Sequence, residues 1–352
     1  MHHAAIECRG GLYEMGRQYG EARADELTRA LEDFFGLFSH FPHPADRQGL
    51  VRAARRLLEP AAAFDPDAVG FIRGQAEGAR ADFREVFCLH CFLEIMFNYA
   101  NLSSMCTSLA LTGPATKDGG TIAGQNIDWF TCSPVDLLRL LHADGSRAFA
   151  VCLFGVPYYF MTSAGICNCA NLTFGPGMPG AQVPLTVYLS KAMRAPGLGE
   201  AISVIRSAAN GLGYYHLADA SGNALGIESV PGAQVELRPR NGVLVHANHY
   251  ESEQFRPLDQ GLAYMPDSPL RSQRMTRLIA DHHGRLGIEE VMEMLRDHDG
   301  LPYSICRHPD PNVPPVLATE SRASIIMLPG KGVLWISFGP PCENAYQEHL
   351  LM

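Results

Sequence analysis

Apolar residues recur at close to a helical period through the first third of the chain. The segments 44–64 and 65–83 also carry helix-start signals, notably Asp65 directly before Pro66. We therefore predict helices over residues 14 to 100. The residues that fall near a 3.6-residue period in the first of these helices are Met15, Tyr19, Leu27, Leu31, Phe34, Phe35 and Phe38.

From Cys106 onward the pattern changes to short apolar segments divided by Gly, Pro and Asp, which predicts a meander of strands. Expected strands cover 107–113, 120–130, 135–144, 147–155, 212–230 (with a turn at 219–223) and 242–250, and a last hairpin covers 321–339. Helices are expected at 183–209 and as a pair at 269–297. This order predicts an α+β fold, a four-layer αββα sandwich of two mainly antiparallel sheets between helical layers.

Composition excludes several classes of function. The 352 residues are 47% hydrophobic and 18% charged, which is ample for a globular core. A net charge of −9 without a block of like charge argues against nucleic-acid binding. No apolar run approaches the 18 or so residues that a membrane span requires. The N-terminus lacks a basic segment followed by an apolar one, so no signal peptide and a cytoplasmic location are expected.

Ten cysteines are scattered through apolar stretches, which is typical of buried thiols in a reducing compartment. Cys88 and Cys91, with His90 between them, have the spacing of half a zinc site. Their segment is typical of a buried helix, and no second ligand pair stands at a suitable spacing, so structural thiols are favoured. Cys167 and Cys169 receive the same interpretation, and no metal or cofactor is expected.

Cys106 differs from the other cysteines because it is the first residue of the β-rich part. If the chain were cut before it, the freed α-amine, with a pKa of roughly 7.7–8.0, would accept the thiol proton near neutral pH. Nucleophile and general base would then belong to one residue. A buried strand cysteine without a catalytic role is the ordinary alternative.

Six motifs in order carry a family resemblance. The chain resembles the acyl-coenzyme A:6-aminopenicillanic acid acyltransferase branch of the N-terminal-nucleophile hydrolases, with the choloylglycine hydrolases and acid ceramidases as more distant relatives. The resemblance implies a helical pro-segment or small subunit over 1–105 and a catalytic large subunit over 106–352. The motifs are CTS (106–108), GQNIDW (124–129), HANHY (246–250), DHDGLPYSICRH (297–308), ESRAS (320–324) and GPPC (339–342).

The resemblance also implies catalytic roles. Cys106 matches the nucleophile, exposed when the precursor cuts itself between Met105 and Cys106. Asp128 matches an aspartate that organises the nucleophile's amine, and Asn248 an amide that forms half of the oxyanion hole. Asn171 is a weaker match for the other half. Arg307 matches an arginine beside the thiolate, where a fixed cation lowers a thiol's pKa.

Ser108, Ser321 and Arg322 are the substrate-binding residues that the resemblance implies. If Arg307 and Arg322 flank Cys106, the pocket is locally positive and favours substrates that carry a carboxylate. If both arginines pair with internal acids such as Asp128 or Glu320, that attraction disappears.

Three positions depart from the family pattern, and one of them is Ala247, which stands where threonine is common. Met105 stands where glycine is common, and glycine eases the strained backbone that an N→S acyl shift requires. Gln125 stands where the bile-salt enzymes carry an arginine, which favours the acyltransferase branch.

The predicted function is an autoproteolytic cysteine amidohydrolase or acyltransferase that acts on the C–N amide or thioester bond of a small acylated molecule. Two subunits from one precursor are expected, and homo-oligomerisation is left open. Two alternatives remain: an uncleaved, catalytically retired binding protein, which Met105 favours, and a papain-like Cys/His protease. The protease would need Cys106 at the start of a helix, with His and Asn downstream.

Overall fold

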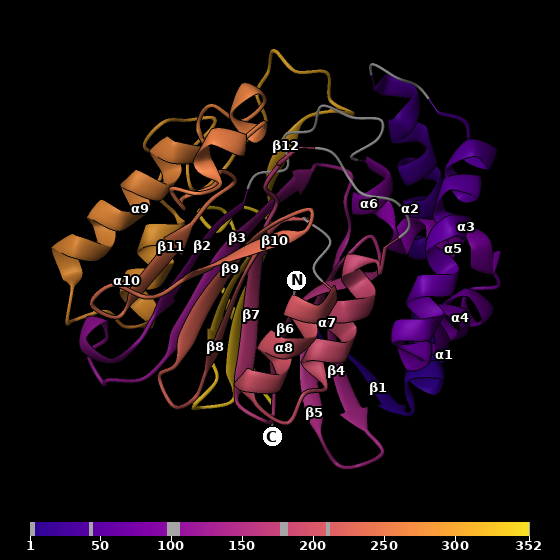
Figure 1. Ribbon diagram of the computed structural model, residues 1–352, viewed down its shortest axis with the longest axis horizontal. Helices are drawn as coiled ribbons and strands as arrows, with labels where there is room; N and C mark the ends of the chain where they lie inside the picture. The colour runs from indigo at the N-terminus through magenta and orange to yellow at the C-terminus, as the bar shows by residue number, and fades with distance from the viewer. Residues whose placement is uncertain (1–3, 42–44, 97–105, 177–181, 209–211, 352) are drawn as a thin grey trace.

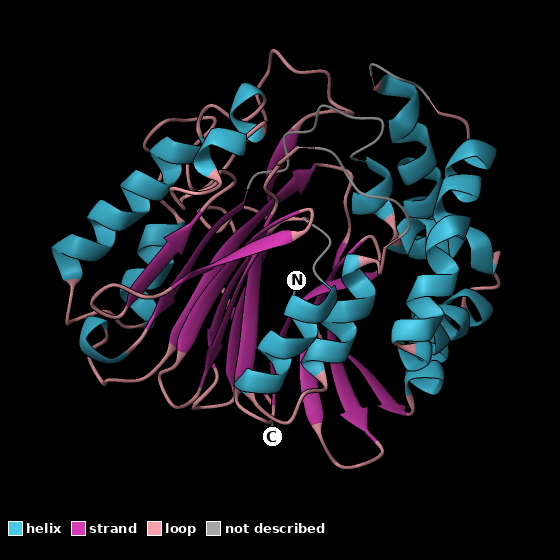
Figure 2. Ribbon diagram, in the orientation of Figure 1, coloured by secondary structure: helices cyan, strands magenta, loops and turns pink. Residues whose placement is uncertain are grey.

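A computed structural model describes residues 4–41, 45–96, 106–176, 182–208 and 212–351. Two β-sheets are stacked face to face, with helices outside both of them (Figures 1 and 2). The predicted α+β sandwich of mainly antiparallel sheets is therefore confirmed. Among the described residues, no helix is long and apolar enough to cross a membrane.

Sheet A has eight strands and sheet B has six. Sheet A runs in the order β1 (Ile6–Gly10), β4 (Val135–His142), β5 (Arg147–Leu153), β6 (Val156–Thr162), β7 (Ile166–Asn171), β8 (Tyr214–Asp219), β9 (Ala224–Val230) and β10 (Ala233–Leu237). Sheet B runs in the order β11 (Val243–His246), β2 (Cys106–Leu111), β3 (Ile122–Phe130), β12 (Thr319–Leu328), β13 (Val333–Phe338) and β14 (Gln347–Leu350). Strand β1 pairs with β4 in parallel, and the other pairings are antiparallel.

Helices pack on the outer face of each sheet. On the sheet A side lie α1 (Leu12–Ala22), α2 (Ala24–Leu37), α3 (Arg47–Phe64), α4 (Pro66–Gly78), α5 (Phe83–His90), α6 (Phe92–Met96), α7 (Leu185–Met193) and α8 (Leu198–Ala208). On the sheet B side lie α9 (Ser268–His282) and α10 (Ile288–Leu295), which contact β11, β3 and β12.

Strand β2 is buried on both faces because it lies between a sheet and a helical layer. Side chains alternate along a strand. Leu109 and Leu111 accordingly join the apolar cluster beneath α9 and α10. Ser108 points the other way and reaches Asn171 of β7 in sheet A. Cys106, two residues before Ser108, shares that inner face at the start of the strand.

The local sequence signals place most elements correctly. The predicted helix start is confirmed, since the Asp65 carboxylate accepts a hydrogen bond from the Ala68 N–H and Pro66 is the first residue of α4. Strand β1 was not anticipated, and it makes residues 6–10 part of sheet A. The core that fills the space around sheet A includes residues from both sides of position 105.

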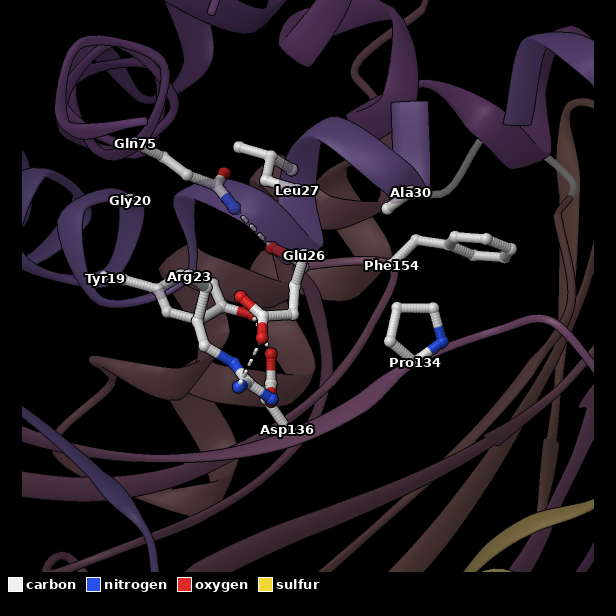
Figure 3. Close-up of a pocket in the computed structure, with 11 residues that line it drawn as sticks. Tyr19, Gly20, Arg23, Glu26, Leu27, Ala30, Gln75, Pro134, Asp136 and Phe154 are labelled. Atoms are coloured by element: carbon white, nitrogen blue, oxygen red, sulfur yellow. Dashed lines mark hydrogen bonds and ion pairs between the residues drawn. The ribbon is translucent and has the colours of Figure 1, made fainter. Parts of the chain in front are cut away.

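A polar junction connects the N-terminal helices to sheet A (Figure 3). The Tyr19 hydroxyl of α1 donates a 2.8 Å hydrogen bond to the Asp136 carboxylate of β4, and Arg23 forms an ion pair with the same carboxylate. Gln75 of α4 donates to the Gly155 carbonyl at 2.8 Å, in the turn between β5 and β6. These contacts, together with β1, attach the N-terminal segment to the rest of the fold.

Tyr19→Phe should lower the free energy of unfolding by roughly 1.5–3 kcal/mol, because it removes a buried hydrogen bond to a charged acceptor. Tyr13→Phe is the matched control on the same helix, since the Tyr13 hydroxyl also bonds a carboxylate, Glu77, but at the exposed surface. Its expected loss is within about 0.5 kcal/mol. Urea denaturation measures both, and equal losses would show that the junction adds nothing beyond a surface contact.

Candidate active site

Cys106 begins β2, and a side-chain amide holds its backbone nitrogen. Its N–H donates a 2.7 Å hydrogen bond to Oδ1 of Asn248, which lies in the bend after β11. Pairing of β11 with β2, with His246 opposite Ser108, brings that bend to the start of β2. Nδ2 of Asn248 donates to the Leu172 carbonyl at 2.9 Å, so the orientation of the amide is set from both ends.

Asn171, the last residue of β7, faces Cys106 from sheet A. Its Oδ1 accepts a 2.5 Å hydrogen bond from the Ser108 hydroxyl, which directs Nδ2 away from that serine. This Nδ2 is buried and has no hydrogen-bond partner among the described residues. Cys106 and Asn171 line the same cavity. An unused amide donor beside a thiol is the arrangement that an oxyanion site requires.

The cavity beside Cys106 is mainly apolar and small, at about 30 Å³. A volume of this size accommodates about one water molecule. Tyr158 and Tyr159 line it and also belong to the buried apolar core. The other lining residues are Leu93, Trp129, Leu153, Ala170, Leu172, Leu185, Gly213 and Tyr215.

A buried cluster of charges lies on the α9 side of the same strand end. The Asp128 carboxylate of β3 accepts a 2.6 Å hydrogen bond from the Ser321 hydroxyl, which in turn accepts one from the Arg307 N–H at 3.0 Å. Nε of Arg307 lies 3.8 Å from Asp128 Oδ2, and its Nη2 donates to Asp267 at 2.8 Å. The structure thus brings Asp128, Ser321 and Arg307 together, with Asp267 as the main partner of Arg307.

Arg271 of α9 is a site residue that the sequence did not reveal. Its guanidinium donates to the Cys106 carbonyl and to the Thr107 hydroxyl, both at 2.8 Å, and to Asn248 Oδ1 at 3.0 Å. Nε of Arg271 pairs with Asp267 at 2.8 Å. In sequence, Asp267 and Arg271 form an i,i+4 pair, a spacing that is common on exposed helix surfaces. No signal in the sequence distinguishes this pair from a solvated one.

The environment keeps the Cys106 thiol protonated. Burial and, to a smaller extent, the charge of Asp128 raise its pKa to about 11, while the Asp128 N–H, Gln125 and Arg271 act in the opposite direction. Burial also raises the pKa of Asp128 to about 7, against the lowering effects of Arg307, Arg271 and Ser321. The thiol therefore needs a base before it can act as a nucleophile near neutral pH.

Gln125 connects the two sheets directly behind the thiol. Its Nε2 donates to the Ala170 carbonyl at 2.7 Å, and its Oε1 accepts from the Ala170 N–H at 3.0 Å. The side chain thereby imitates a pair of strand hydrogen bonds across the inter-sheet space and fixes the spacing of β3 and β7 beside Cys106.

Arg322 is not brought to this site. Its guanidinium donates to the Ser133 carbonyl at 3.0 Å and pairs with Glu320, and it does not line the cavity beside Cys106. Arg322 and Arg307 are thus both paired with internal acids. This is the second of the two arrangements that the sequence allowed, in which the attraction for a substrate carboxylate disappears. A substrate-binding role for Arg322 stays a prediction. Met105 lies outside the described residues.

Cys88 and Cys91 are both buried at the junction of α5 and α6. Nε2 of His90, the residue between them, lies 2.8 Å from Gln75 Oε1 in a hydrogen bond. Burial lowers the pKa of His90 to about 3, so the ring is neutral. This geometry agrees with the structural role expected for these thiols.

Comparison with known proteins gives one family match and a set of similar solved structures. Residues 195–341, less than half of the chain, match the model of the acyl-coenzyme A:6-aminopenicillanic acid acyl-transferase family. No curated protein matches the sequence. Among the solved structures, a mutant of the conjugated bile acid hydrolase from Clostridium perfringens is similar at 12% identity with a TM-score of 0.48, over 69% of this chain and 96% of its own. A penicillin V acylase from Agrobacterium tumefaciens is similar at 14% identity with a TM-score of 0.45, over 66% and 83%.

Over residues 195–341 the chain is therefore similar to a family of amine-acylating enzymes. More specifically, the resemblance to the acyl-coenzyme A:6-aminopenicillanic acid acyltransferase family is confirmed by the match. The matched range includes Asn248, Arg307 and Ser321. Cys106 and Asp128 lie outside it.

Arg271→Lys should impair the site, because lysine keeps the charge but loses the planar fork that reaches the Cys106 carbonyl, Thr107 and Asn248 together. Loss of one or two charge-assisted hydrogen bonds predicts a fall in kcat/KM of roughly 10–100-fold. Hydrolysis of an N-acyl anilide reporter measures this, and circular dichroism checks the fold. Arg277→Lys, on the exposed face of α9, is the matched control. An Arg271→Lys enzyme with unchanged kcat/KM would show that Arg271 has no part in positioning Cys106.

Proposed function

We propose that this chain is an autoproteolytically activated amidohydrolase and acyltransferase, with Cys106 as its N-terminal nucleophile. It would cleave the C–N amide bond, or a thioester bond, of a small molecule with an apolar acyl group. The observation that carries the proposal is the arrangement at the start of β2. There Asn248 holds the Cys106 nitrogen, and the Cys106 side chain lines an apolar cavity beside the Asn171 amide donor, which has no partner among the described residues.

Activation would release the α-amine. The Cys106 thiol attacks the carbonyl carbon of Met105, the peptide C–N bond breaks, and the thiol proton passes to the nitrogen, which becomes the free amine. Water then hydrolyses the resulting thioester, leaving a carboxylate on Met105 and a free thiol on Cys106. Asn248 would support this step because its Oδ1 accepts from the Cys106 amide nitrogen and would accept equally from the amine that cleavage releases.

Catalysis would repeat the same chemistry on a substrate. The α-amine takes the thiol proton, and the sulfur attacks the acyl carbon. The tetrahedral intermediate collapses when the amine leaving group takes that proton and departs, which leaves acyl-Cys106. Water or a second amine then attacks the thioester and restores the thiol.

Asn171 is the best-placed group to stabilise the oxyanion. Its Nδ2 is buried, unpartnered among the described residues and held in orientation by Ser108. One such donor contributes about 2.7–4 kcal/mol to the transition state. Asn248 would act chiefly on the amine, since its Oδ1 accepts from the Cys106 nitrogen and its Nδ2 already donates to Leu172.

The cavity favours an apolar acyl group. Aromatic and aliphatic side chains make up most of its lining, and Arg307 and Arg322 are paired with acids elsewhere. At about 30 Å³ the cavity is too small for an acyl chain, so we propose that cleavage before Cys106 enlarges it. A panel of N-acyl amines and acyl thioesters, with and without amine acceptors, identifies the acyl group and separates hydrolysis from transfer.

The two products of cleavage, residues 1–105 and 106–352, are expected to remain associated as small and large subunits. The pairing of β1 with β4 and the Tyr19–Asp136 hydrogen bond both cross the proposed division. A cytoplasmic location stays a prediction from the sequence, and homo-oligomerisation stays open.

Cys106→Ala should abolish both self-cleavage and amide hydrolysis, because it removes the sulfur on which both steps depend. Intact-mass analysis should resolve the active enzyme into chains of 105 residues and, since 352 − 105 = 247, of 247 residues. Cys106→Ser should still cut, but more slowly. A single uncut chain that hydrolyses amides at full rate would overturn the mechanism.

Two further variants complete this experiment. Cys132→Ala replaces an exposed free cysteine just after β3, and it should leave cleavage and activity unchanged. Met105→Gly should accelerate self-cleavage, because glycine relaxes the backbone at the scissile bond.

The pH profile distinguishes the amine base from a pre-formed thiolate. If the α-amine is the base, kcat/KM rises with pH as the amine loses its proton, with an apparent pKa of roughly 7.7–8.0. If a thiolate acts without a base, the rise follows the thiol, whose pKa burial raises to about 11. Initial rates on a neutral substrate, measured over a range of roughly pH 5.5 to 10, separate the two.

A further inference from the structure

A second cluster of chemically active side chains lies behind Arg307. His298, Cys306 and His308 come from the irregular segment between α10 and β12, and Cys342 follows β13. One ligand atom from each of the four lies within 4.8 Å of the others. Cys306 and Cys342 are 36 positions apart in sequence, so the fold of the sheet brings them together.

Four of the six separations within the cluster fit a tetrahedral metal, and the other two, from His298 to the sulfurs, are at most 4.8 Å. Zinc–sulfur bonds of about 2.3 Å and zinc–nitrogen bonds of about 2.0–2.1 Å place ligands of a tetrahedron about 3.8 Å (S–S), 3.3 Å (N–N) and 3.5 Å (S–N) apart. The two sulfurs lie 3.5 Å apart, and the two Nε2 atoms 3.2 Å apart. His308 Nε2 lies 3.8 Å from Cys306 Sγ and 3.3 Å from Cys342 Sγ.

We propose that His298, Cys306, His308 and Cys342 bind one zinc ion as a Cys₂His₂ site. Two thiolates and two imidazoles are the donor set that a structural zinc site uses. All four tetrahedral positions are filled by protein side chains, so none is left for water or substrate. The site is therefore structural and takes no part in the acyl chemistry.

The surroundings of His308 support this assignment. Its Nε2 faces the two sulfurs, and its Nδ1 faces the Glu343 carboxylate at 3.6 Å. A carboxylate beyond the second ring nitrogen favours a proton there and leaves the Nε2 lone pair for a metal. Glu343 directly follows the ligand Cys342, so one short loop supplies both groups.

The position of the site gives it a consequence for the fold. Cys306 and His308 flank Arg307, whose guanidinium reaches Asp267 and Asp128 instead. The segment from 296 to 318 contains no helix or strand, and contacts such as the Asn126 hydrogen bond to the Ile305 carbonyl and the Arg274–Asp297 ion pair hold parts of it. The metal would join this segment to the loop after β13 and thereby hold Arg307 in the buried charge cluster.

Metal analysis of the purified, reduced chain tests the proposal. Elemental analysis should find about one zinc per chain, as for a closed four-ligand site. A strong chelator should remove it and lower Tm, and added zinc should restore both. Substituted Co²⁺ should give the visible absorption of a tetrahedral thiolate complex. The result that would overturn the proposal is a chain with no bound zinc, whose Tm neither chelator nor zinc changes.

Variants make the test specific. Cys342→Ser and His298→Ala should each lose zinc and lower Tm, and the chelator should then cause little further change. Cys132→Ser, at an exposed cysteine away from the cluster, should keep the metal. Cys106→Ala should also keep it, so failure of the catalytic proposal and failure of the zinc proposal remain distinguishable.

A disulfide between Cys306 and Cys342 is the competing state of the same sulfurs. It would make the chain lighter by two hydrogen atoms under non-reducing conditions and would link the two peptides in a digest. Finding that linkage in metal-free protein prepared under reducing conditions would overturn the zinc site.

Discussion

The buried charge cluster at the start of β2 is the constraint on which the rest of the site depends. Arg271 and Arg307 each have only 1% of the side chain exposed, and Asp267 accepts from both of them. An unpaired buried ion costs several kcal/mol, so each charge requires its partners in place. Because Arg271 lies in α9, Asp128 in β3 and Arg307 in the segment before β12, their pairing positions three separate elements around Cys106.

Alternation along one strand separates the two environments that the chemistry requires. The inner face of β2 presents Cys106 and Ser108 to sheet A, where the cavity is apolar and Asn171 supplies an amide donor. On the α9 side, Arg271 holds the Cys106 carbonyl and Thr107. The sulfur is thereby placed in a buried apolar pocket that raises its pKa, while the backbone that carries it is fixed by charge-assisted hydrogen bonds.

Two peripheral connections support this centre from opposite sides. The hydrogen bond from Tyr19 to Asp136 and the β1–β4 pairing attach the N-terminal helices to sheet A, which would keep a cleaved small subunit in place. The Cys and His cluster around Arg307 would attach an irregular segment to sheet B. Neither connection lines the cavity beside Cys106. Each therefore affects how the proposed catalytic groups are positioned without contacting the reacting atoms.

The sequence determined the local elements and the order of the motifs. Helical periodicity in the first third, the short apolar segments after Cys106, and the Asp65–Pro66 start are short-range signals, and the structure confirms them over the residues that it describes. Strand β1 was missed because five residues carry little periodicity of their own, and its place depends on the partner β4. Asn248 and Arg307 were found only because they stand in motifs.

Tertiary structure decided which charges meet and which donors stay unpartnered. In the sequence, the i,i+4 pair Asp267–Arg271 resembles a surface ion pair. Packing of α9 onto sheet B buries the pair, and Arg271 then supports Cys106. The same reason explains the metal cluster. Cys342 lies far from Cys306 in sequence, and only the pairing of β12 with β13 brings their sulfurs to 3.5 Å. Spacing along a chain describes neighbours within a helix or strand, whereas contacts across sheets depend on register and layer, which local patterns do not specify.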